Sequence, residues 1–270
     1  MSNEEGGVRS LLGRIGRSSR VSLRGAHCSV NSLADLLPCY DQLSSSTLMT
    51  ELAGNTFIDG PAGRIEAIIK DPAARVSRAA IVCHPHPLFG GTMHNKVVFR
   101  IARAFQNAGF AVLRFNFRGT GKSEGQHDNG LGEQDDLRAV IEFAQRRYPE
   151  AEIWLAGFSF GSAVLLRAAA CDERVRAFIA AGVPLSKYDF SGLLKCNKPK
   201  LFVHGSQDEY GAASDLEKLF ATLDEPKELR IIDGADHFFE GALTELSDAV
   251  SRFIVSVDAG QRPQLRPPAD

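Results

Sequence analysis

The stretch GFSFG, at Gly157–Gly161, lies between a short apolar run, Ile153–Ala156, and an apolar segment with helical character, Phe160–Ala170. A serine placed between two glycines, after a strand and before a helix, predicts a sharp turn with the hydroxyl at its apex. Glycine is expected at the flanking positions because such a turn leaves no room for side chains. The serine itself is expected in a strained backbone conformation, with the positive end of the next helix beside it.

A serine hydroxyl is a weak nucleophile unless a base, oriented by an acid, accepts its proton. In that order the chain offers Ser159, then Asp208 after the predicted strand Leu201–His204, then His237 after the predicted strand Leu229–Ile232. Carboxyl ends of parallel strands meet at one edge of a sheet, so we expect the three side chains to lie together. The same two loops contain three other carboxylates, which stay open as alternatives for the acid: Glu209, Asp233 and Asp236.

The loop HPHPLFGGTMHNK, at His84–Lys96, follows an early predicted strand. Acyl transfer needs two main-chain N–H groups to hold the developing oxyanion, one after the nucleophile and one from such a loop. Phe160 is the expected first donor. Proline has no N–H, so His86 is the expected second donor, with Leu88 as the alternative. We also expect the side chains of Leu88 and Phe158 to contact the substrate.

Two other features of these loops have alternative interpretations. Three histidines raise the possibility of a metal site: His84, His86 and His94. Metal-binding histidines usually come with acidic or cysteine ligands, which this loop lacks, so no metal and no cofactor are expected. Cys83, at a strand end, is expected to be buried packing rather than a nucleophile.

The loop Asn116–Gly125 contains glycines, a lysine and a serine, but its spacing does not match a phosphate-binding loop. We therefore expect a structural turn. Arg118 is expected to hold it by pairing with an acidic residue further along the chain: Asp128, Glu133 or Asp136.

Strand and helix patterns alternate outward from these loops, which predicts a mainly parallel sheet with helices on both faces. Two strands around a turn at Asp59–Gly63 predict a hairpin at the sheet edge. The predicted strands are Thr56–Ile58, Arg64–Ile69, Ala79–Cys83, Phe110–Phe115, Ile153–Ala156, Val175–Ala181, Leu201–His204 and Leu229–Ile232. The predicted helices are Asn95–Asn107, Gln134–Arg147, Phe160–Ala170, Ser214–Leu223 and Leu243–Val257. The link Gly182–Pro199 is too short for a cap of several helices, which average about 11–12 residues each.

Composition limits the partners. The 270 residues include 31 Lys and Arg against 33 Asp and Glu, so there is no global basic excess for nucleic acid or an anionic membrane. The longest apolar stretches have about nine residues, against about 20 for a membrane helix. The 5 cysteines show no metal-binding spacing and favour a reducing compartment. A small-molecule substrate in the cytoplasm is therefore expected, and the oligomeric state stays open.

The two ends of the chain differ from the part between them, where one domain is expected over residues 49–258. Residues 1–48 lack periodicity and are rich in arginine and serine. They predict a disordered extension or a start codon set too early, with an organelle-targeting segment as the alternative. Residues 259–270 contain three prolines and no apolar periodicity, which predicts a disordered tail.

The chain resembles the α/β-hydrolase superfamily over about Phe57–Ser256. It is most similar to small bacterial hydrolases with an H-P-H-P-L-[FY]-G-G-T-M loop and an F-N-F-R-G-x-G-x-S-x-G loop, relatives of dienelactone hydrolases and of serine peptidases with this fold. These loops are His84–Met93 and Phe115–Gly125 here. The resemblance implies an α/β-hydrolase fold with little or no cap, and a catalytic triad of Ser159, Asp208 and His237.

Together, these features predict a cofactor-free serine hydrolase that cleaves an ester or thioester of a small or soluble substrate through an acyl-enzyme. One alternative is a small-peptide peptidase, although peptidases of this fold usually carry a large accessory domain. The other is a non-catalytic hydrolase-fold binding protein, which the complete set of serine, acid and histidine disfavours.

Overall fold

The computed structural model of the protein describes residues 55–170, 172–190, 193 and 196–260. The predictions for residues 1–48, and for the tail beyond residue 260, lie outside these residues. No helix in the described part of the chain is both long and apolar enough to cross a membrane.

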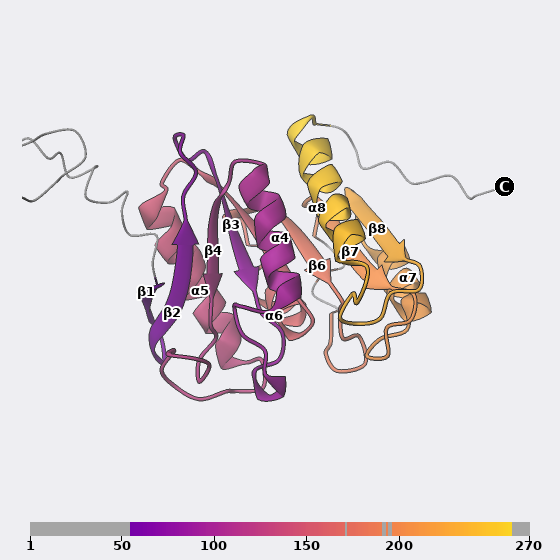
Figure 1. The fold of residues 1–270 in the computed structure, drawn as a ribbon, viewed down its shortest axis with the longest axis horizontal. Helices are drawn as coiled ribbons and strands as arrows, with labels where there is room; N and C mark the ends of the chain where they lie inside the picture. Colours follow the sequence, from indigo (N-terminus) through magenta and orange to yellow (C-terminus); the bar gives the residue numbers. More distant parts are fainter. Residues whose placement is uncertain (1–54, 171, 191–192, 194–195, 261–270) are drawn as a thin grey trace, which may run out of the picture. The chain divides into compact units, whose positions relative to one another are not determined.

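Eight strands in the described residues form one sheet in the order β1-β2-β4-β3-β5-β6-β7-β8 (Figure 1). They are β1 (Asn55–Gly60), β2 (Gly63–Lys70), β3 (Arg78–Cys83), β4 (Ala111–Phe115), β5 (Glu152–Phe158), β6 (Val175–Ala181), β7 (Lys200–Gly205) and β8 (Lys227–Ile232). β1 and β2 form the antiparallel hairpin expected at the edge, and β2 is also antiparallel to β4. Every pairing from β4 to β8 is parallel. The predicted fold class is confirmed.

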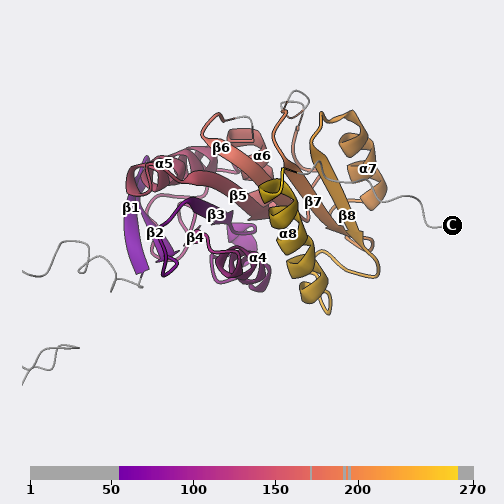
Figure 2. The same ribbon diagram turned by 90° about the horizontal axis from the view of Figure 1, so that it is seen from above.

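Helices cover both faces of the sheet (Figure 2). The described helices are α4 (Lys96–Asn107), α5 (Gly132–Arg147), α6 (Phe160–Ala168), α7 (Ala213–Thr222) and α8 (Leu243–Asp258). α4 and α8 pack on one face, whereas α5, α6 and α7 pack on the other. Side chains alternate between the faces of a strand, so β5 contributes Leu155 to one core, and Trp154 and Phe158 to the other.

The link between β6 and β7 contains turns and no α-helix in its described residues. These described residues form no helical cap, in line with the expectation from the length of the link. A short 3₁₀ helix, η2 (Pro87–Phe89), was not predicted and lies in the loop after β3. It forms because Phe89 N–H donates to His86 O and Gly90 N–H donates to Pro87 O, with Gly90 in the left-handed region at φ 76°.

Candidate active site

The turn after β5 has the strained geometry that the sequence predicts. Ser159 has φ 54° and ψ −119°, a conformation that residues other than glycine rarely adopt, and α6 begins at the next residue. Neighbouring backbone explains the two glycines. A Cβ on Gly157 would lie 2.5 Å from the carbonyl oxygen of Gly161, and one on Gly161 would lie 2.6 Å from the carbonyl oxygens of Cys83 and His84. Any larger residue at these positions would force the turn open.

Ser159, His237 and Asp208 form a hydrogen-bonded row at the carboxyl edge of the sheet. The Ser159 Oγ lies 2.9 Å from His237 Nε2, and His237 Nδ1 lies 2.8 Å from Asp208 Oδ2. Since an ionised carboxylate only accepts, Nδ1–H donates to Asp208 and Nε2 is left to accept the Ser159 hydroxyl proton. The other carboxylate oxygen of Asp208 accepts the Tyr210 N–H at 2.8 Å. The row is therefore oriented for proton transfer from the serine.

In the described part of the chain, none of the three alternative carboxylates bonds to His237: two make other hydrogen bonds and the third is exposed. Asp236 Oδ1 accepts the Glu240 N–H, and Asp233 Oδ1 accepts the Ser206 hydroxyl. Glu209 is exposed. Of the four carboxylates in these loops, Asp208 is the one bonded to His237.

Aromatic rings hold the His237 imidazole in place. Its centroid lies 4.5 Å from that of the Tyr210 ring, 5.1 Å from that of Phe158 and 5.3 Å from that of Phe238, whose ring is nearly perpendicular to the imidazole. Gly182, with φ 55°, passes close by, and a Cβ there would lie 3.3 Å from the imidazole. The expectation of a substrate contact at Phe158 is corrected: its side chain is fully buried and packs against His237, on the face that alternation along β5 assigns to it.

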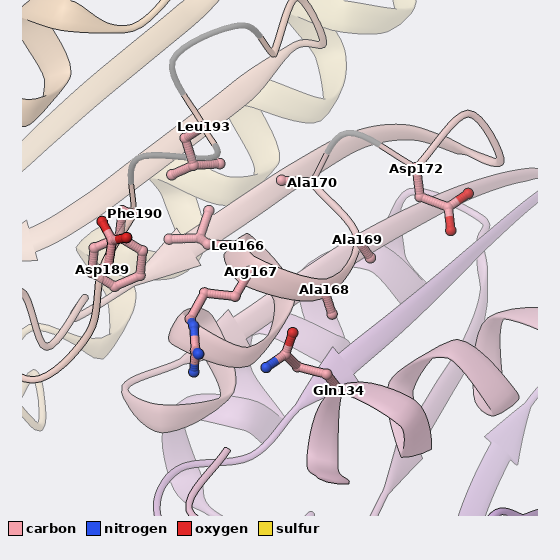
Figure 3. A pocket seen from close by; sticks show the side chains of 10 residues that line it. All are labelled: Gln134, Leu166, Arg167, Ala168, Ala169, Ala170, Asp172, Asp189, Phe190 and Leu193. Atoms are coloured by element: carbon pink, nitrogen blue, oxygen red, sulfur yellow. The ribbon is translucent and has the colours of Figure 1, made fainter. Parts of the chain in front are cut away.

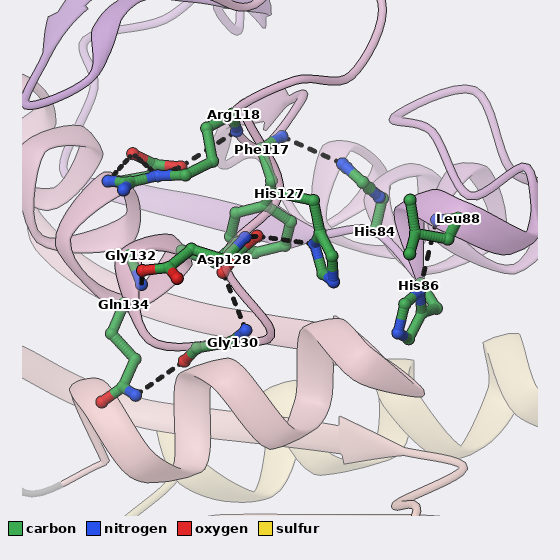
Figure 4. Close-up of polar contacts among 12 residues, drawn as sticks. His84, His86, Leu88, Phe117, Arg118, His127, Asp128, Gly130, Gly132 and Gln134 are labelled. Carbon is green, nitrogen blue, oxygen red and sulfur yellow. Dashed lines mark hydrogen bonds and ion pairs between the residues drawn. The ribbon is translucent and has the colours of Figure 1, made fainter. Parts of the chain in front are cut away.

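His84 holds the loop after β3 against its neighbour after β4 (Figure 4). Its Nδ1–H donates to the Pro85 carbonyl at 2.6 Å, and Nε2 accepts the Phe117 N–H at 3.0 Å. Burial lowers the pKa of this ring to about 4, so it is neutral near pH 7. Both nitrogens are occupied. The described residues contain no group of three or more His, Cys, Asp or Glu side chains that could hold a metal ion.

His86 stabilises the same loop through a hydrogen bond within it. Its side-chain Nδ1 accepts the Leu88 N–H at 3.2 Å (Figure 4). The Leu88 N–H is thereby engaged, which favours the main-chain N–H of His86 over the alternative as an oxyanion donor. Phe160 is the first residue of α6, where a backbone N–H has no partner within the helix. A Cβ on Gly91 would lie 2.1 Å from the Pro85 carbonyl oxygen, so the loop is tightly folded.

A cavity of about 650 Å³ opens at Ser159. Rings form much of its lining, from His86, Phe89, Phe160, Tyr188 and Tyr210. Polar and charged groups join them from Asn129, Ser186, Lys187 and Glu209. Leu88, one of the two residues expected to contact the substrate, does not line this cavity and is 70% exposed, whereas its neighbour Phe89 does line it. An aromatic residue in a proline- and glycine-rich loop was the signal available in the sequence.

The loop after β4 is held to α5 by two buried carboxylates (Figure 4). Arg118 donates to both oxygens of Asp136, which raises the pKa of the guanidinium and confirms the supporting role predicted for Arg118. Glu133 accepts the N–H groups of Asp128 and Gly130, both at 2.8 Å. These contacts fix the position of the chain that carries Asn129 to the cavity.

A second cavity, of about 360 Å³, lies beside α6 (Figure 3). Leu166, Arg167, Phe190 and Leu193 are among its lining residues. None of the predicted site residues lines it, and it is separate from Ser159.

Comparison with known proteins agrees with this architecture. Residues 86–192 match the family described as the alpha/beta hydrolase fold. An α/β serine hydrolase homologue from Coxiella burnetii is 40% identical, with a TM-score of 0.70 over 74% of this chain and 96% of that one. A serine hydrolase without a lid from Xanthomonas campestris is 37% identical, with a TM-score of 0.69 over 79% of this chain and 96% of that one.

An uncharacterized protein of Rickettsia prowazekii is 35% identical over 212 residues, which cover 75% of this chain and 89% of the relative. The chain belongs to the α/β-hydrolase family, and the two similar structures named above are a serine hydrolase homologue and a serine hydrolase without a lid.

Proposed function

We propose that the protein is a cofactor-free serine hydrolase that cleaves carboxylic esters or thioesters of small or soluble substrates. The observation that carries this proposal is the hydrogen-bonded row of Ser159, His237 and Asp208 at the strained turn after β5. A hydroxyl held 2.9 Å from an imidazole that is itself oriented by a buried carboxylate is the arrangement that activates a serine.

In the first half of the reaction, Ser159 Oγ attacks the substrate carbonyl carbon while His237 Nε2 takes the hydroxyl proton. Asp208 keeps the imidazole oriented and stabilises its cation. The carbonyl oxygen becomes an oxyanion, held by the main-chain N–H groups of Phe160 and His86. The tetrahedral intermediate collapses, the imidazolium returns the proton to the leaving alcohol or thiol, and an acyl-enzyme remains.

In the second half, a water molecule attacks the acyl carbon. His237 takes a proton from this water, and a second tetrahedral oxyanion occupies the same two donors. Its collapse releases the carboxylic acid and returns the proton to Ser159. Apart from the substrate and this water molecule, the chain's own groups carry out both halves.

The open cavity and the short link between β6 and β7 support a small acyl group. Each buried CH₂ contributes about 0.8 kcal/mol, so an open site stops gaining affinity once the chain leaves the protein. For p-nitrophenyl esters from acetate to palmitate, kcat/KM should rise over the first few carbons and then level off or fall. A steady increase beyond about ten carbons, or activation at a lipid–water interface, would contradict this part of the proposal.

The proposal is tested most directly by covalent labelling. A fluorophosphonate probe should react with the native enzyme, and peptide mass spectrometry should locate the adduct on Ser159. A panel of p-nitrophenyl esters and aminoacyl amides then distinguishes an esterase from a peptidase. Labelling at another residue would refute Ser159 as the nucleophile. No labelling together with no hydrolysis of any substrate would refute a serine hydrolase.

A further inference from the structure

Four rings form a continuous wall on the cavity at Ser159. The centroid of Phe89 lies 4.9 Å from His86, His86 lies 4.9 Å from Phe160, and Phe160 lies 6.3 Å from Tyr188. They come from η2, the loop before it, α6 and the link after β6. A fifth ring, Tyr210, lines the cavity from the loop after β7 and packs against His237.

The lining is aromatic rather than aliphatic. Pro184 is the one aliphatic residue among the described residues that line this cavity. Hydrophobic burial alone would be served equally well by leucine, isoleucine or valine. Aromatic walls add the offset and edge-to-face contacts that rings make with other rings, and these contacts distinguish a planar ligand from an alkyl group of the same size.

The exposure of Phe89 points the same way. This side chain is 85% exposed, yet it stands on a 3₁₀ turn that backbone hydrogen bonds hold in place. The adjacent Leu88 is 70% exposed as well, so the apolar surface here is contiguous, and such a surface beside a cavity is typical of a binding site. The two charges on the lining, Lys187 and Glu209, are of opposite sign and give no preference for an anion or a cation.

We infer that the substrate of this site is an uncharged ester with a planar aromatic ring a few bonds from the reacting carbonyl, seated against the ring wall of Phe89, His86, Phe160 and Tyr188. This inference rests on the proposed hydrolase function and names the substrate class for it.

The inference is tested with esters matched in size and in carbonyl reactivity. The acyl pair is methyl 3-phenylpropanoate against methyl 3-cyclohexylpropanoate, and the alcohol pair is benzyl acetate against cyclohexylmethyl acetate. None of the four has a nitrophenyl group, so no other ring competes for the wall. We expect kcat/KM to favour the aromatic member of at least one pair by about 5-fold or more, the size of a typical ring–ring preference.

Variants locate the preference on the wall. Phe89→Leu and Tyr188→Leu should each lower the aromatic-to-cyclohexyl ratio, while Phe99→Leu, a control at an exposed phenylalanine on α4, should keep it. Ratios within about twofold of one for both pairs, or ratios unchanged in both wall variants, would overturn the inference. Failure of the hydrolase proposal can be told apart from failure of this inference, because in that case p-nitrophenyl acetate would not be hydrolysed either.

A different observation supports a second inference, at a histidine behind this wall. His127 packs against His86 at 4.9 Å and against Phe160 at 5.5 Å, and its side chain is 10% exposed. Its Nδ1 lies 2.7 Å from Oε1 of the fully buried Glu133, outside hydrogen-bond alignment. Its Nε2 has no hydrogen-bond partner in the described part of the chain. A phenylalanine would fill this space without leaving a buried nitrogen unpaired, so the imidazole calls for an explanation.

The hydrogen bond between His86 and Leu88 suggests why a histidine stands at position 127. His86 Nδ1 can accept the Leu88 N–H only while it carries no proton, and this bond folds the loop that presents the His86 main chain. Glu133 is a buried negative charge that favours a proton on a nearby imidazole. His127 is the ring next to that carboxylate. The other titratable side chains around His86 in the described residues are His84, on its own loop, and four on the shared cavity: Lys187, Tyr188, Glu209 and Tyr210.

We propose that His127 is a positioning residue: it stands between Glu133 and His86, takes up the attraction of the carboxylate, and so keeps His86 uncharged and bonded to Leu88. Burial and the His127 charge both lower the pKa of His86, whereas Glu133 raises it. Removing His127 therefore leaves Glu133 free to favour the proton on His86, which would break the bond to Leu88.

The test is an NMR titration of the histidine rings with His127→Phe, which keeps an aromatic ring, and His127→Gln as a second variant. We expect the His86 pKa to rise in both, and the Leu88 amide resonance to shift with the same midpoint. Between pH 8 and pH 6, fluorophosphonate labelling should fall several-fold more in the variants than in the native enzyme, since His237 is common to all. The proposal would be overturned if the His86 pKa were unchanged in the variants, or if the Leu88 amide resonance did not shift as His86 titrates. Either result stands whether or not the protein hydrolyses esters.

Discussion

The turn at residues 157–161 and the loop at residues 84–91 are both folded too tightly for an added side chain, but for different reasons. In the turn, Gly157 is pressed against the carbonyl of Gly161, four residues away. In the loop, Gly91 is pressed against Pro85, but the loop as a whole is held from a distance: His84 bonds Phe117, and His86 packs on His127. The close contact at Gly157 is local to the turn, although Gly161 also meets the carbonyl groups of Cys83 and His84. The loop depends in addition on side-chain partners 33 or more positions away.

This difference teaches which parts of the proposed site tolerate change. The turn should lose function through any single alteration of its serine or its glycines. The loop should respond to changes in residues that never contact a substrate. Four expected results follow, from the largest effect to the smallest: two concern the Ser159 turn and the acid that supports it, and two concern the loop.

Replacing the nucleophile is the largest disruption of the turn. Ser159→Ala should lower kcat for ester hydrolysis by roughly 10³-fold or more, because only binding and the oxyanion donors would remain. Thermal unfolding should stay close to that of the native protein, since the serine hydroxyl contributes no core packing. Fluorophosphonate labelling that persists in this variant would show that another residue is the nucleophile.

Replacing the acid should come next. Asp208→Asn should lower kcat by about 10²-fold or more, because an amide favours the wrong imidazole tautomer. Asp236→Asn is the matched control in the His237 loop and should change kcat less than about twofold, since its carboxylate bonds the Glu240 N–H instead. The reverse pattern, a crippled Asp236 variant beside an active Asp208 variant, would reassign the acid.

The loop contains His84, whose burial should make the stability of the protein depend on pH. The unfolded His84 ring takes up a proton near pH 6.5, whereas the folded ring does so only at about 4. The unfolded state therefore binds more protons in this window, and the free energy of unfolding should fall by about 3 kcal/mol as pH drops through it. Urea unfolding at a series of pH values measures this slope.

His84→Gln provides the control for that slope. Glutamine cannot titrate but keeps an oxygen able to accept the Phe117 N–H. Its stability should depend less steeply on pH between 6.5 and 4 than that of the native protein. Equal slopes in the two proteins would mean that His84 does not titrate as its burial implies.

Crowding the loop should have the smallest effect. In Gly91→Ala the added methyl would meet the Pro85 carbonyl, and relief of that clash should cost about 1–3 kcal/mol of stability. It should also lower kcat/KM about tenfold by moving the His86 main chain. The nearby Gly90→Ala adds its methyl to open space and introduces only the strain of a positive φ, so its effect on kcat/KM should be smaller. Equal kinetic effects would argue against crowding as the cause.

The course of the strands was predictable because apolar periodicity is a local property, but their ends were not. The hairpin turn expected over residues 59–63 is shorter in the structure, since Asp59 pairs with Arg64 and Gly60 with Gly63. Neither Leu88 nor Phe158, the two residues expected to contact the substrate, lines the cavity at Ser159. Phe158 lies four positions after Trp154 on β5, so both side chains point to the same face of the sheet. Phe158 is therefore part of the core and packs against His237.

The sequence by itself determined the strand–turn–helix around Ser159, the order of serine, acid and histidine, and the sheet that brings their loops to one edge. Each of these follows from spacing along the chain. Tertiary structure alone separated Asp208 from the other three carboxylates as the partner of His237, engaged the Leu88 amide with His86, and decided which rings line the cavity. All three features depend on close contacts between segments far apart in the sequence, such as the backbone contact between Gly205 and Ala235. A local sequence pattern cannot predict such distances, because the segments meet only when the sheet is assembled.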